Sequence, residues 1–388
     1  MVLFLHNRYR ATGGEERVVE DLLALVRERL GERAELLTRD SSAIAPARAA
    51  AGLLRGGIDS AAVAEIVREE GVRIVHAHNL LPTFGWRALA AARDAGARIV
   101  LHLHQYRLVC AVGVCFTKGE ECTRCHGRNT LPGIVRNCRG NRAEGLVYGA
   151  SLALWQQRMT GLADVVVVPS RFAASRLAEL GAPLPSEVLV LPPPVKAPEP
   201  PASKPAESGY ALVVSRLAPE KGVDVAIDAC RIAGIPLRIA GDGPQLEALS
   251  ARAAGADVRF LGSVATGELP ALRAGAAIAL VPSRSAETFG IAAAEAMAAR
   301  LPVAASRIGA LPELLPPEAL VEPGDAPALA AAIGRLAGDA ESGQRGRARV
   351  LELCSPEAVA GRLREIYERA AGPRDSLAAT TAALGDPS

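Results

Sequence analysis

Short runs of apolar residues alternate along this chain with longer stretches in which apolar residues recur every three or four positions. The runs have the length of buried strands, and the longer stretches have the periodicity of amphipathic helices. In the first half the expected strands are Val2–His6, Ala34–Thr38, Arg73–Ala77, Arg98–Leu103, Asp164–Val168 and Glu187–Leu191. The clearest helices between them are Glu16–Arg29, Ser60–Glu70 and Arg171–Leu180. This alternation predicts a parallel β-sheet covered by helices.

A proline-rich segment, residues 192–208, separates this half from the next. Seven of its seventeen residues are proline, so we expect a linker between an N-terminal domain, residues 1–191, and a C-terminal domain, residues 209–354. The expected strands of the second domain are Ala211–Ser215, Leu237–Ala240, Val258–Leu261, Ala277–Val281 and Val303–Ala305. A further helix is expected over residues 355–371, followed by a disordered tail, residues 372–388. The pattern predicts an α/β chain with two Rossmann-like domains and a C-terminal helix.

Composition excludes some classes of partner. The 388 residues carry a formal net charge of +2 and only 3% aromatic residues, so the chain lacks the positive field and the stacking surfaces that nucleic acid requires. The seven cysteines are an odd number, and the apolar start, Met1–Leu5, is too short for a signal peptide or a membrane helix. We therefore expect a reduced, cytoplasmic protein without a nucleic-acid partner.

The most informative segment runs from Pro282 to Glu295. The apolar strand Ala277–Val281 leads into it, and Gly290 precedes an alanine-rich helix. The first N–H groups of such a helix favour a phosphate group. Glu287 lies beside them and can accept hydrogen bonds from hydroxyl groups, and Glu295 can project toward the same crevice. Phosphate recognition beside hydroxyl recognition indicates a nucleotide sugar.

Two other turns of the second half also follow expected strands. Arg216 and Lys221 lie after the first strand, where a guanidinium and an ammonium group can neutralise a diphosphate without a metal. Gly241 and Gly243 follow the second strand and permit close approach of the backbone, although a lone Gly-x-Gly is weak evidence for a dinucleotide site. Taken one at a time, these residues are better explained as solvated charges and plain turns. Their joint placement at the ends of successive strands favours a binding site.

These motifs, in this order, resemble the donor domain of retaining glycosyltransferases of family 4, which have the GT-B fold of two facing Rossmann-like domains. The matching segments are Ser-Arg-Leu…Glu-Lys-Gly at 215–222, Gly-Asp-Gly-Pro at 241–244 and Pro-Ser…Glu-Thr-Phe-Gly…Glu at 282–295. The resemblance covers nearly the whole chain. Its combined motifs are specific for the family and not for the substrate.

The resemblance implies a role for each matched residue. It implies that Arg216 and Lys221 hold the diphosphate and that Glu287 binds hydroxyl groups of the sugar. The other implied contacts are the backbone N–H groups of Phe289, Gly290 and Ile291 and, for the nucleotide ribose, Glu295. The nucleoside diphosphate-sugar is then a co-substrate, and catalysis requires no cofactor.

The first half carries candidate residues at the ends of its strands. Gly13 and Gly14 precede a helix, and the resemblance places them beside the donor phosphates and the acceptor; an ordinary flexible turn is the alternative. His104 begins His-Gln-Tyr-Arg, which resembles a His-Asn-Tyr-Arg segment in one branch of the family, and it is expected to hydrogen-bond the donor sugar. His76 and His78 could shape an acceptor cleft, but satisfied polar groups at a strand end explain them equally well.

Cysteines crowd into an insertion, residues 105–141. The four candidate metal ligands are Cys110, Cys122, Cys125 and Cys138. Two of them have the Cys-x-x-Cys spacing of a metal knuckle, so the set can form a structural zinc site, with Cys115 or His126 able to replace one ligand. A similar insertion occurs in the branch named above. A redox pair or unligated buried thiols are the alternatives.

The same insertion is basic, and an apolar segment, residues 145–155, follows it at about half the length of a bilayer span. A basic lip beside an apolar helix is suited to peripheral docking on an anionic membrane or to a lipid-phosphate acceptor. A buried helix with a solvated basic edge is the commoner outcome.

The sequence thus predicts a retaining, metal-independent glycosyltransferase that moves a sugar from a nucleoside diphosphate-sugar to an acceptor hydroxyl group. The acceptor could be a glycan, a lipid-linked sugar or a natural product. A nucleotide-sugar epimerase of the same architecture and a non-catalytic sugar-nucleotide-binding scaffold are the alternatives.

Overall fold

The computed structural model describes residues 1–8, 13–198 and 209–372. The chain forms two compact units. The N-terminal unit consists of Met1–Gly113, Thr123–Pro193 and the chain from Val359 onward. The C-terminal unit consists of Val114–Cys122 and Pro194–Ala358. Most of the expected linker and nearly all of the expected tail lie outside the described residues.

The N-terminal unit contains a parallel sheet in the order β2-β1-β3-β4-β7-β8. Its strands are β1 (Val2–Arg8), β2 (Ala34–Asp40), β3 (Ile74–Ala77), β4 (Arg98–His102), β7 (Val165–Val168) and β8 (Leu189–Val190). Each coincides with an expected strand to within three residues at either end. The chain runs from β1 to β2 on one side of β1 and then crosses back to β3 on the other side of β1. The carboxyl ends of the neighbouring strands β1 and β3 therefore form a topological switch point.

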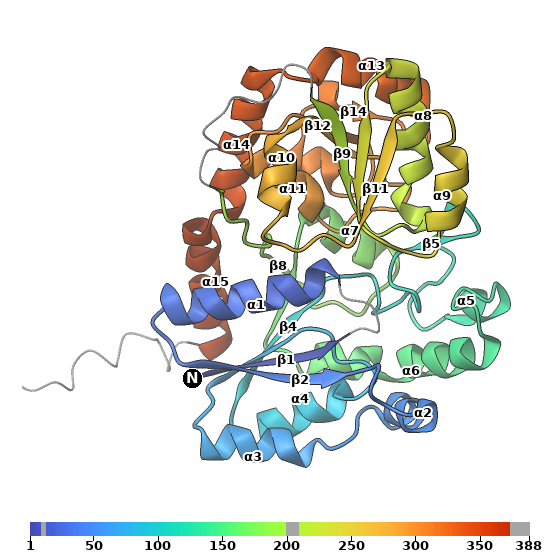
Figure 1. Cartoon of the computed structure of the whole chain (residues 1–388). Coiled ribbons are helices and arrows are strands. Elements are labelled where there is room, and N and C mark those ends of the chain that lie inside the picture. The colour runs from blue at the N-terminus through green and yellow to red at the C-terminus, as the bar shows by residue number, and fades with distance from the viewer. Residues whose placement is uncertain (9–12, 199–208, 373–388) are drawn as a thin grey trace, which may run out of the picture. The chain divides into compact units, whose positions relative to one another are not determined.

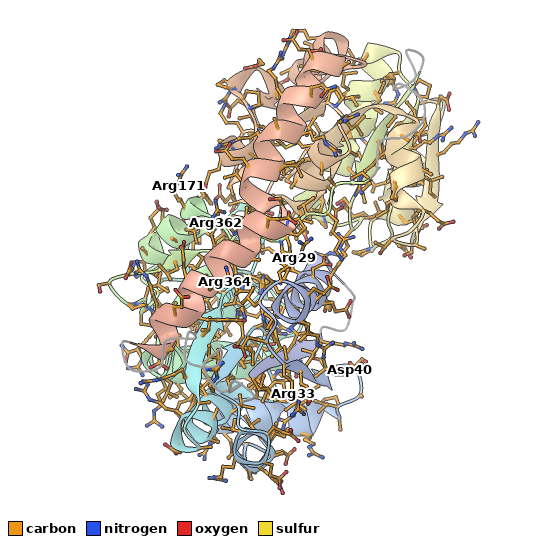
Figure 2. The ribbon with its side chains drawn as sticks, turned by 90° about the vertical axis from the view of Figure 1, so that its left-hand side faces the viewer. Arg29, Arg33, Asp40, Arg171, Arg362 and Arg364 are labelled. Carbon is orange, nitrogen blue, oxygen red and sulfur yellow. The ribbon has the colours of Figure 1, made fainter. Side chains whose placement is uncertain are left out.

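Helices cover both faces of this sheet. They are α1 (Gly14–Glu28), α2 (Pro46–Arg55), α3 (Ala61–Glu69), α4 (Gly85–Asp94), α5 (Leu131–Val135), α6 (Arg142–Gly161), α7 (Arg171–Glu179) and α15 (Pro356–Ala371). Figure 1 shows α1 and α15 on one side of β1 and α3 and α4 on the other. From Val359 onward α15 belongs to this unit: Leu363 and Tyr367 are buried, whereas Arg364 projects outward (Figure 2).

The C-terminal unit contains a second parallel sheet, in the order β11-β10-β9-β12-β13-β14. Its strands are β9 (Tyr210–Val214), β10 (Leu237–Ala240), β11 (Val258–Gly262), β12 (Ala276–Val281), β13 (Val303–Ser306) and β14 (Leu320–Val321). Its helices are α8 (Val223–Ala233), α9 (Leu246–Arg252), α10 (Leu269–Ala274), α11 (Ile291–Ala298), α12 (Leu311–Leu314), α13 (Ala326–Leu336) and α14 (Ala340–Cys354), with the 3-10 turns η1 (Pro219–Lys221) and η2 (Pro317–Ala319). In Figure 1, α8, α9 and α13 lie on one side of the sheet and α10, α11 and α14 on the other. The predicted α/β class with two Rossmann-like halves is confirmed.

Three short strands were not predicted from the sequence. The strand β14 adds an edge to the second sheet, and β5 (Phe116–Thr117) pairs with β6 (Glu120–Glu121) as a small hairpin in the cysteine-rich insertion. Two-residue strands carry too little periodicity to be recognised without their partners.

The apolar segment 145–155 lies within α6. One side of this helix is buried, including Tyr148 and Leu152, while Leu146 and Leu154 on the other side are exposed. In the part of the chain that the structure describes, no helix combines the length and the hydropathy needed to cross a bilayer.

Candidate functional site

The switch point of the second sheet brings two sequence-predicted segments together. The central strand β9 pairs with β10 on one side and β12 on the other, so the loops that follow β9 and β12 leave from neighbouring strands. Ligands of open α/β sheets bind at this position. The loop after β9 carries Arg216 and Lys221, and the loop after β12 carries Glu287.

An ion pair joins these two loops. The Nζ atom of Lys221 donates to Oε1 of Glu287 at 2.7 Å, and the hydroxyl of Ser283 donates to the same oxygen at 2.6 Å. Burial alone would raise the pKa of Glu287, but the Lys221 charge and the hydrogen bonds from Lys221 and Ser283 outweigh it and lower the pKa. Glu287 is therefore ionised at neutral pH and pairs with the partly exposed Lys221 cation.

Arg216 presents a second cation at the same edge. Its guanidinium group pairs with the buried Glu220, and half of its side chain is exposed. The carbonyl of Glu220 accepts from the backbone N–H groups of Arg284, at 2.8 Å, and Ser285, at 3.3 Å. Arg284 in turn donates to Asp224 at 2.6 Å. The positions of both loops are thus coupled through Glu220, a residue that the sequence analysis did not single out.

Close backbone contacts fix the loop of Glu287. A Cβ atom on Gly222 would lie 2.1 Å from the carbonyl oxygen of Pro282, and one on Gly309 would lie 2.3 Å from the backbone nitrogen of Glu287. The N–H group of Ala310 donates to the Glu287 carbonyl at 2.9 Å. Gly309 therefore supports Glu287 directly. Sequence reasoning missed it, although its position after the strand β13 was a usable signal.

Gly241 and Gly243 approach protein backbone closely. A Cβ atom would lie 1.9 Å from the carbonyl oxygen of Ser215 for Gly241 and 2.5 Å from that of Leu217 for Gly243. The N–H group of Leu217 also donates to the Asp242 carbonyl at 2.8 Å. The absence of side chains at these glycines thus lets the turn after β10 hold the loop that carries Arg216.

The helix α11 begins at the predicted place. Gly290 is its N-cap residue with a φ of 100°, and a Cβ atom there would lie 2.6 Å from a methyl carbon of Leu311. The Phe289 side chain is buried in the hydrophobic core, and the Ile291 side chain is partly buried and packs against that core. Glu295, one turn further on, pairs with the guanidinium group of Arg273, and both side chains are largely buried.

In the N-terminal unit, Gly13 caps the helix α1 that begins at Gly14. The Gly13 N–H group donates to Oε2 of Glu16 at 2.9 Å, which positions an acidic side chain in the first turn. Glu15 and Glu16 each have a carboxylate oxygen 3.9 Å from a ring nitrogen of the buried His6. The intervening residues 9–12 of the predicted glycine-rich loop lie outside the described residues.

Five of the six histidines gather at the carboxyl ends of β1, β3 and β4. They are His6, His76, His78, His102 and His104. Phe4 pairs in register with His76, which pairs with Val100, so alternation puts all five side chains on one face of the sheet. The Nδ1 atom of His78 lies 2.7 Å from Nε2 of His104, and the His102 and His104 rings stack at 4.0 Å.

Burial keeps the rings of His76, His78, His102 and His104 neutral. Desolvation lowers the pKa of His76 and of His104 to about 3, and it lowers the pKa of His78 and of His102 well below the ordinary value. His78, His102 and His104 also line a pocket with Glu15. His104 thus presents a neutral imidazole to a concave surface, which is suited to hydrogen bonding.

The candidate cysteine ligands fall in both compact units. Cys110, Cys125 and Cys138 belong to the N-terminal unit, and Cys122 belongs to the C-terminal unit, where its N–H group donates to the carbonyl of Cys115 at 2.7 Å. The four-cysteine zinc site stays a prediction.

Two family models match the two halves of the chain. A model described as a glycosyl transferase 4-like domain matches residues 12–194, and one described as glycosyl transferases group 1 matches residues 209–339. Both models describe glycosyltransferases, the class that the resemblance of the motifs implied.

Curated proteins are similar to parts of the chain. It is 41% identical over 111 residues to the MMP alpha-(1->4)-mannosyltransferase of Mycolicibacterium hassiacum, which covers 26% of this chain and 27% of that protein. It is 36% identical over 176 residues to a GDP-mannose-dependent alpha-(1-6)-phosphatidylinositol monomannoside mannosyltransferase of Mycobacterium tuberculosis, covering 39% of this chain and 46% of that protein. The chain thus spans less than half the length of these two relatives.

Solved structures share the fold over nearly the whole chain. Sucrose-phosphate synthase from Thermosynechococcus elongatus superposes with a TM-score of 0.68 at 20% identity, covering 94% of this chain and 98% of its own. The HepE protein of Anabaena, solved with UDP and glucose, has a TM-score of 0.64 at 18% identity, with coverage of 94% and 98%. The chain therefore has the GT-B fold, with an N-terminal half that matches the glycosyl transferase 4-like family and a C-terminal half that matches glycosyl transferases group 1.

Proposed function

We propose that this protein is a retaining, metal-independent glycosyltransferase that transfers a sugar from a nucleoside diphosphate-sugar to an acceptor hydroxyl group. The observation that carries the proposal is the ion pair between Lys221 and Glu287 at the switch point of the second sheet. It combines a cation for phosphate with an ionised carboxylate for hydroxyl groups. The two family matches support the same reaction class.

The donor phosphates bind at the cationic edge. Lys221 and the half-exposed Arg216 neutralise the negative charge of the diphosphate. The first N–H groups of α11, from Gly290 onward, donate to the same diphosphate. Glu287 accepts hydrogen bonds from hydroxyl groups of the sugar. Glu295, which forms an ion pair with Arg273, binds the nucleotide ribose. Protein cations thus supply the charge that a divalent metal would otherwise provide.

The reaction breaks the bond between the anomeric carbon and the leaving phosphate oxygen. Positive charge develops on the sugar, and the acceptor oxygen forms the new bond on the face that the diphosphate leaves. The acceptor proton passes to a departing phosphate oxygen, so no protein nucleophile is required. His104, which is neutral at pH 7, contributes a hydrogen bond to the donor sugar, and the capped start of α1 at Gly13 and Gly14 belongs to the acceptor side.

GDP-mannose is the first donor to test. The relatives that share 36% and 41% identity with parts of the chain are both named as mannosyltransferases, and one name specifies GDP-mannose. The UDP-bound HepE structure has 18% identity and supports the fold alone. UDP-glucose is therefore the comparison donor.

The test is a binding and turnover panel of nucleoside diphosphate-sugars without added metal and with a chelator present. Titration calorimetry measures donor binding, and NMR of the product measures the anomeric configuration. Transfer with retention supports the proposal. Conversion of one nucleotide sugar into another without an acceptor identifies an epimerase, and binding without turnover over a panel of acceptors identifies a scaffold; either result overturns it.

A further inference from the structure

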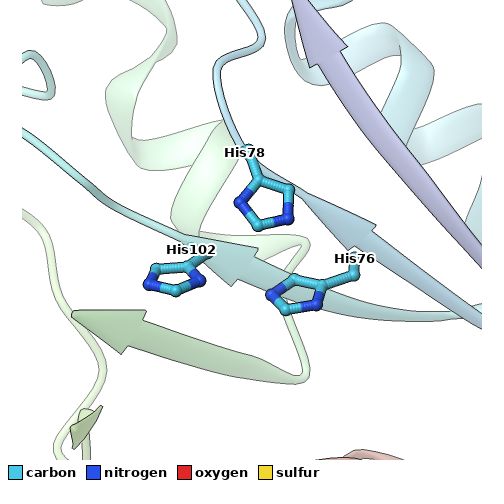
Figure 3. Close-up of side chains that lie close together, drawn as sticks. All are labelled: His76, His78 and His102. Carbon is cyan, nitrogen blue, oxygen red and sulfur yellow. The ribbon is translucent and has the colours of Figure 1, made fainter. Parts of the chain in front are cut away.

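Three buried histidines of the N-terminal unit place their ring nitrogens close together. His76, His78 and His102 each offer a ring nitrogen, and these atoms all lie within 4.8 Å of one another (Figure 3). We propose that these three imidazoles bind a single divalent transition-metal ion, with zinc as the best chemical match. Arg216, Lys221, Glu287 and Glu295 of the proposed donor site belong to the C-terminal unit, whereas the three histidines belong to the N-terminal unit, where His78 contacts His104.

Strand register assembles the three ligands. His76 lies in β3 and His102 at the end of the neighbouring strand β4, and Val100 is the register partner of His76. Because side chains alternate along a strand, His78 and His102 project from the same face as His76. The His76 ring centroid lies 4.4 Å from that of His78 and 5.5 Å from that of His102.

The hydrogen bonds of two rings leave the correct atoms available. Nδ1 of His76 lies 2.9 Å from the hydroxyl oxygen of Tyr367, and Nδ1 of His78 lies 2.7 Å from Nε2 of His104. If each Nδ1–H donates to its partner, Nε2 of both rings carries a lone pair. Ligating histidines use their second nitrogen in this way, which fixes the tautomer and the orientation of the ring.

The remaining nitrogens have no hydrogen-bond partner among the described residues. These are Nε2 of His76, Nε2 of His78 and both ring nitrogens of His102, and each of the three residues is less than 5% exposed. Buried polar atoms are rarely left unsatisfied, because burial removes their hydrogen bonds to water. One metal ion would satisfy an atom on each ring at once.

Ligand chemistry selects the class of metal. Imidazole suits zinc and its neighbours in the transition series, whereas calcium and magnesium prefer oxygen ligands, which the set of three lacks. Tetrahedral zinc at about 2.0–2.1 Å from each nitrogen places the nitrogens about 3.3 Å apart. The rings must therefore approach by an ångström or so from their present spacing, which side-chain rotation can supply.

A fourth coordination position would face the pocket. His78 and His102 both line this pocket, together with Glu15 and Gln105. Three protein ligands with one open position is the arrangement in which zinc binds water or another small ligand. The proposed ion thus orders the carboxyl ends of β3 and β4 and can take an exchangeable ligand there.

The test uses cobalt as a spectroscopic substitute for zinc in the full-length chain, with Cys122→Ser and Cys125→Ser introduced to remove the predicted cysteine site. This double variant is the parent protein of the test. After dialysis against cobalt, elemental analysis of the parent should find one cobalt ion per chain. His102→Asn should lower the cobalt affinity at least 100-fold. Tyr367→Phe keeps the ring but loses the hydrogen bond to His76, and it should lower the affinity about 10–100-fold.

The matched control is Tyr148→Phe, because Tyr148 is also a buried tyrosine of the N-terminal unit but lies outside the histidine cluster. This variant should bind cobalt like its parent. X-ray absorption of the cobalt-loaded parent should show imidazole nitrogens in the first shell, and this measurement decides the case if His102→Asn does not fold. A folded parent that binds no cobalt, a sulfur-containing first shell, or unchanged affinity in His102→Asn would overturn the proposal.

Discussion

Lys221 and Glu287 are 66 residues apart in the chain, and their side chains meet at 2.7 Å where the loops after β9 and β12 converge. Ser283 donates to the same carboxylate oxygen. The pair keeps a carboxylate ionised in a largely buried position and holds the ammonium group in one place.

Replacing the carboxylate should abolish the proposed transfer. We expect Glu287→Gln to lower kcat by about 10²–10³-fold, because an amide cannot stabilise the positive charge that develops on the sugar. Glu247→Gln is the matched control, since Glu247 is exposed on α9. Initial rates with saturating donor measure the effect. A Glu287→Gln variant that retains wild-type turnover would show that another group has this role.

The Glu287 carboxylate should make the free energy of unfolding depend on pH. Its folded-state pKa lies below the ordinary value of 4.5, so the unfolded chain takes up the proton first as the pH falls. The contribution of the pair is then present above pH 4.5 and is lost as the pH falls through the folded-state pKa. Urea unfolding of wild type and Glu287→Gln should give free energies of unfolding that differ at pH 7 and converge in acid. A difference that is independent of pH contradicts the assignment.

Gly309 should be intolerant of a side chain. A Cβ atom there meets the backbone nitrogen of Glu287 at 2.3 Å, at a φ of +62°. We expect Gly309→Ala to lose both activity and about 1–3 kcal/mol or more of stability, because a backbone clash is added to conformational strain. Gly324→Ala is the control: its φ is +87°, and nothing lies within 4 Å of the added carbon. Thermal unfolding and transfer rates should separate the two variants, and equal losses would exclude a clash at Glu287.

His104 should affect turnover more than donor binding. Its proposed hydrogen bond strengthens as charge develops on the sugar, so His104→Ala should lower kcat about tenfold or more while the donor Kd changes little. His126→Ala is the control. Calorimetry gives the Kd and initial rates give kcat. A loss confined to donor affinity would place His104 in ground-state binding instead.

Local pattern in the sequence determined much of the fold and most of the residues proposed for the donor site. Strands such as β10, at Leu237–Ala240, have apolar runs that are recognisable without their neighbours, and residues such as Arg216 and Lys221 follow a strand in an order that already resembles a family. Both signals are local, because they depend on the periodicity of a short segment and on what comes next in the chain.

Tertiary structure decided which distant residues meet. Strand order set β3 beside β4, which turned two pairs of strand-end histidines into one buried cluster. The return of α15 brought Tyr367 to His76 across 291 residues, and the loop after β13 brought Gly309 to Glu287. No short-range pattern encodes these contacts, because they depend on the order and register of strands and on the faces that helices bury. The sequence alone thus determined the elements and the charges at their ends, and packing decided which of those charges and rings act together.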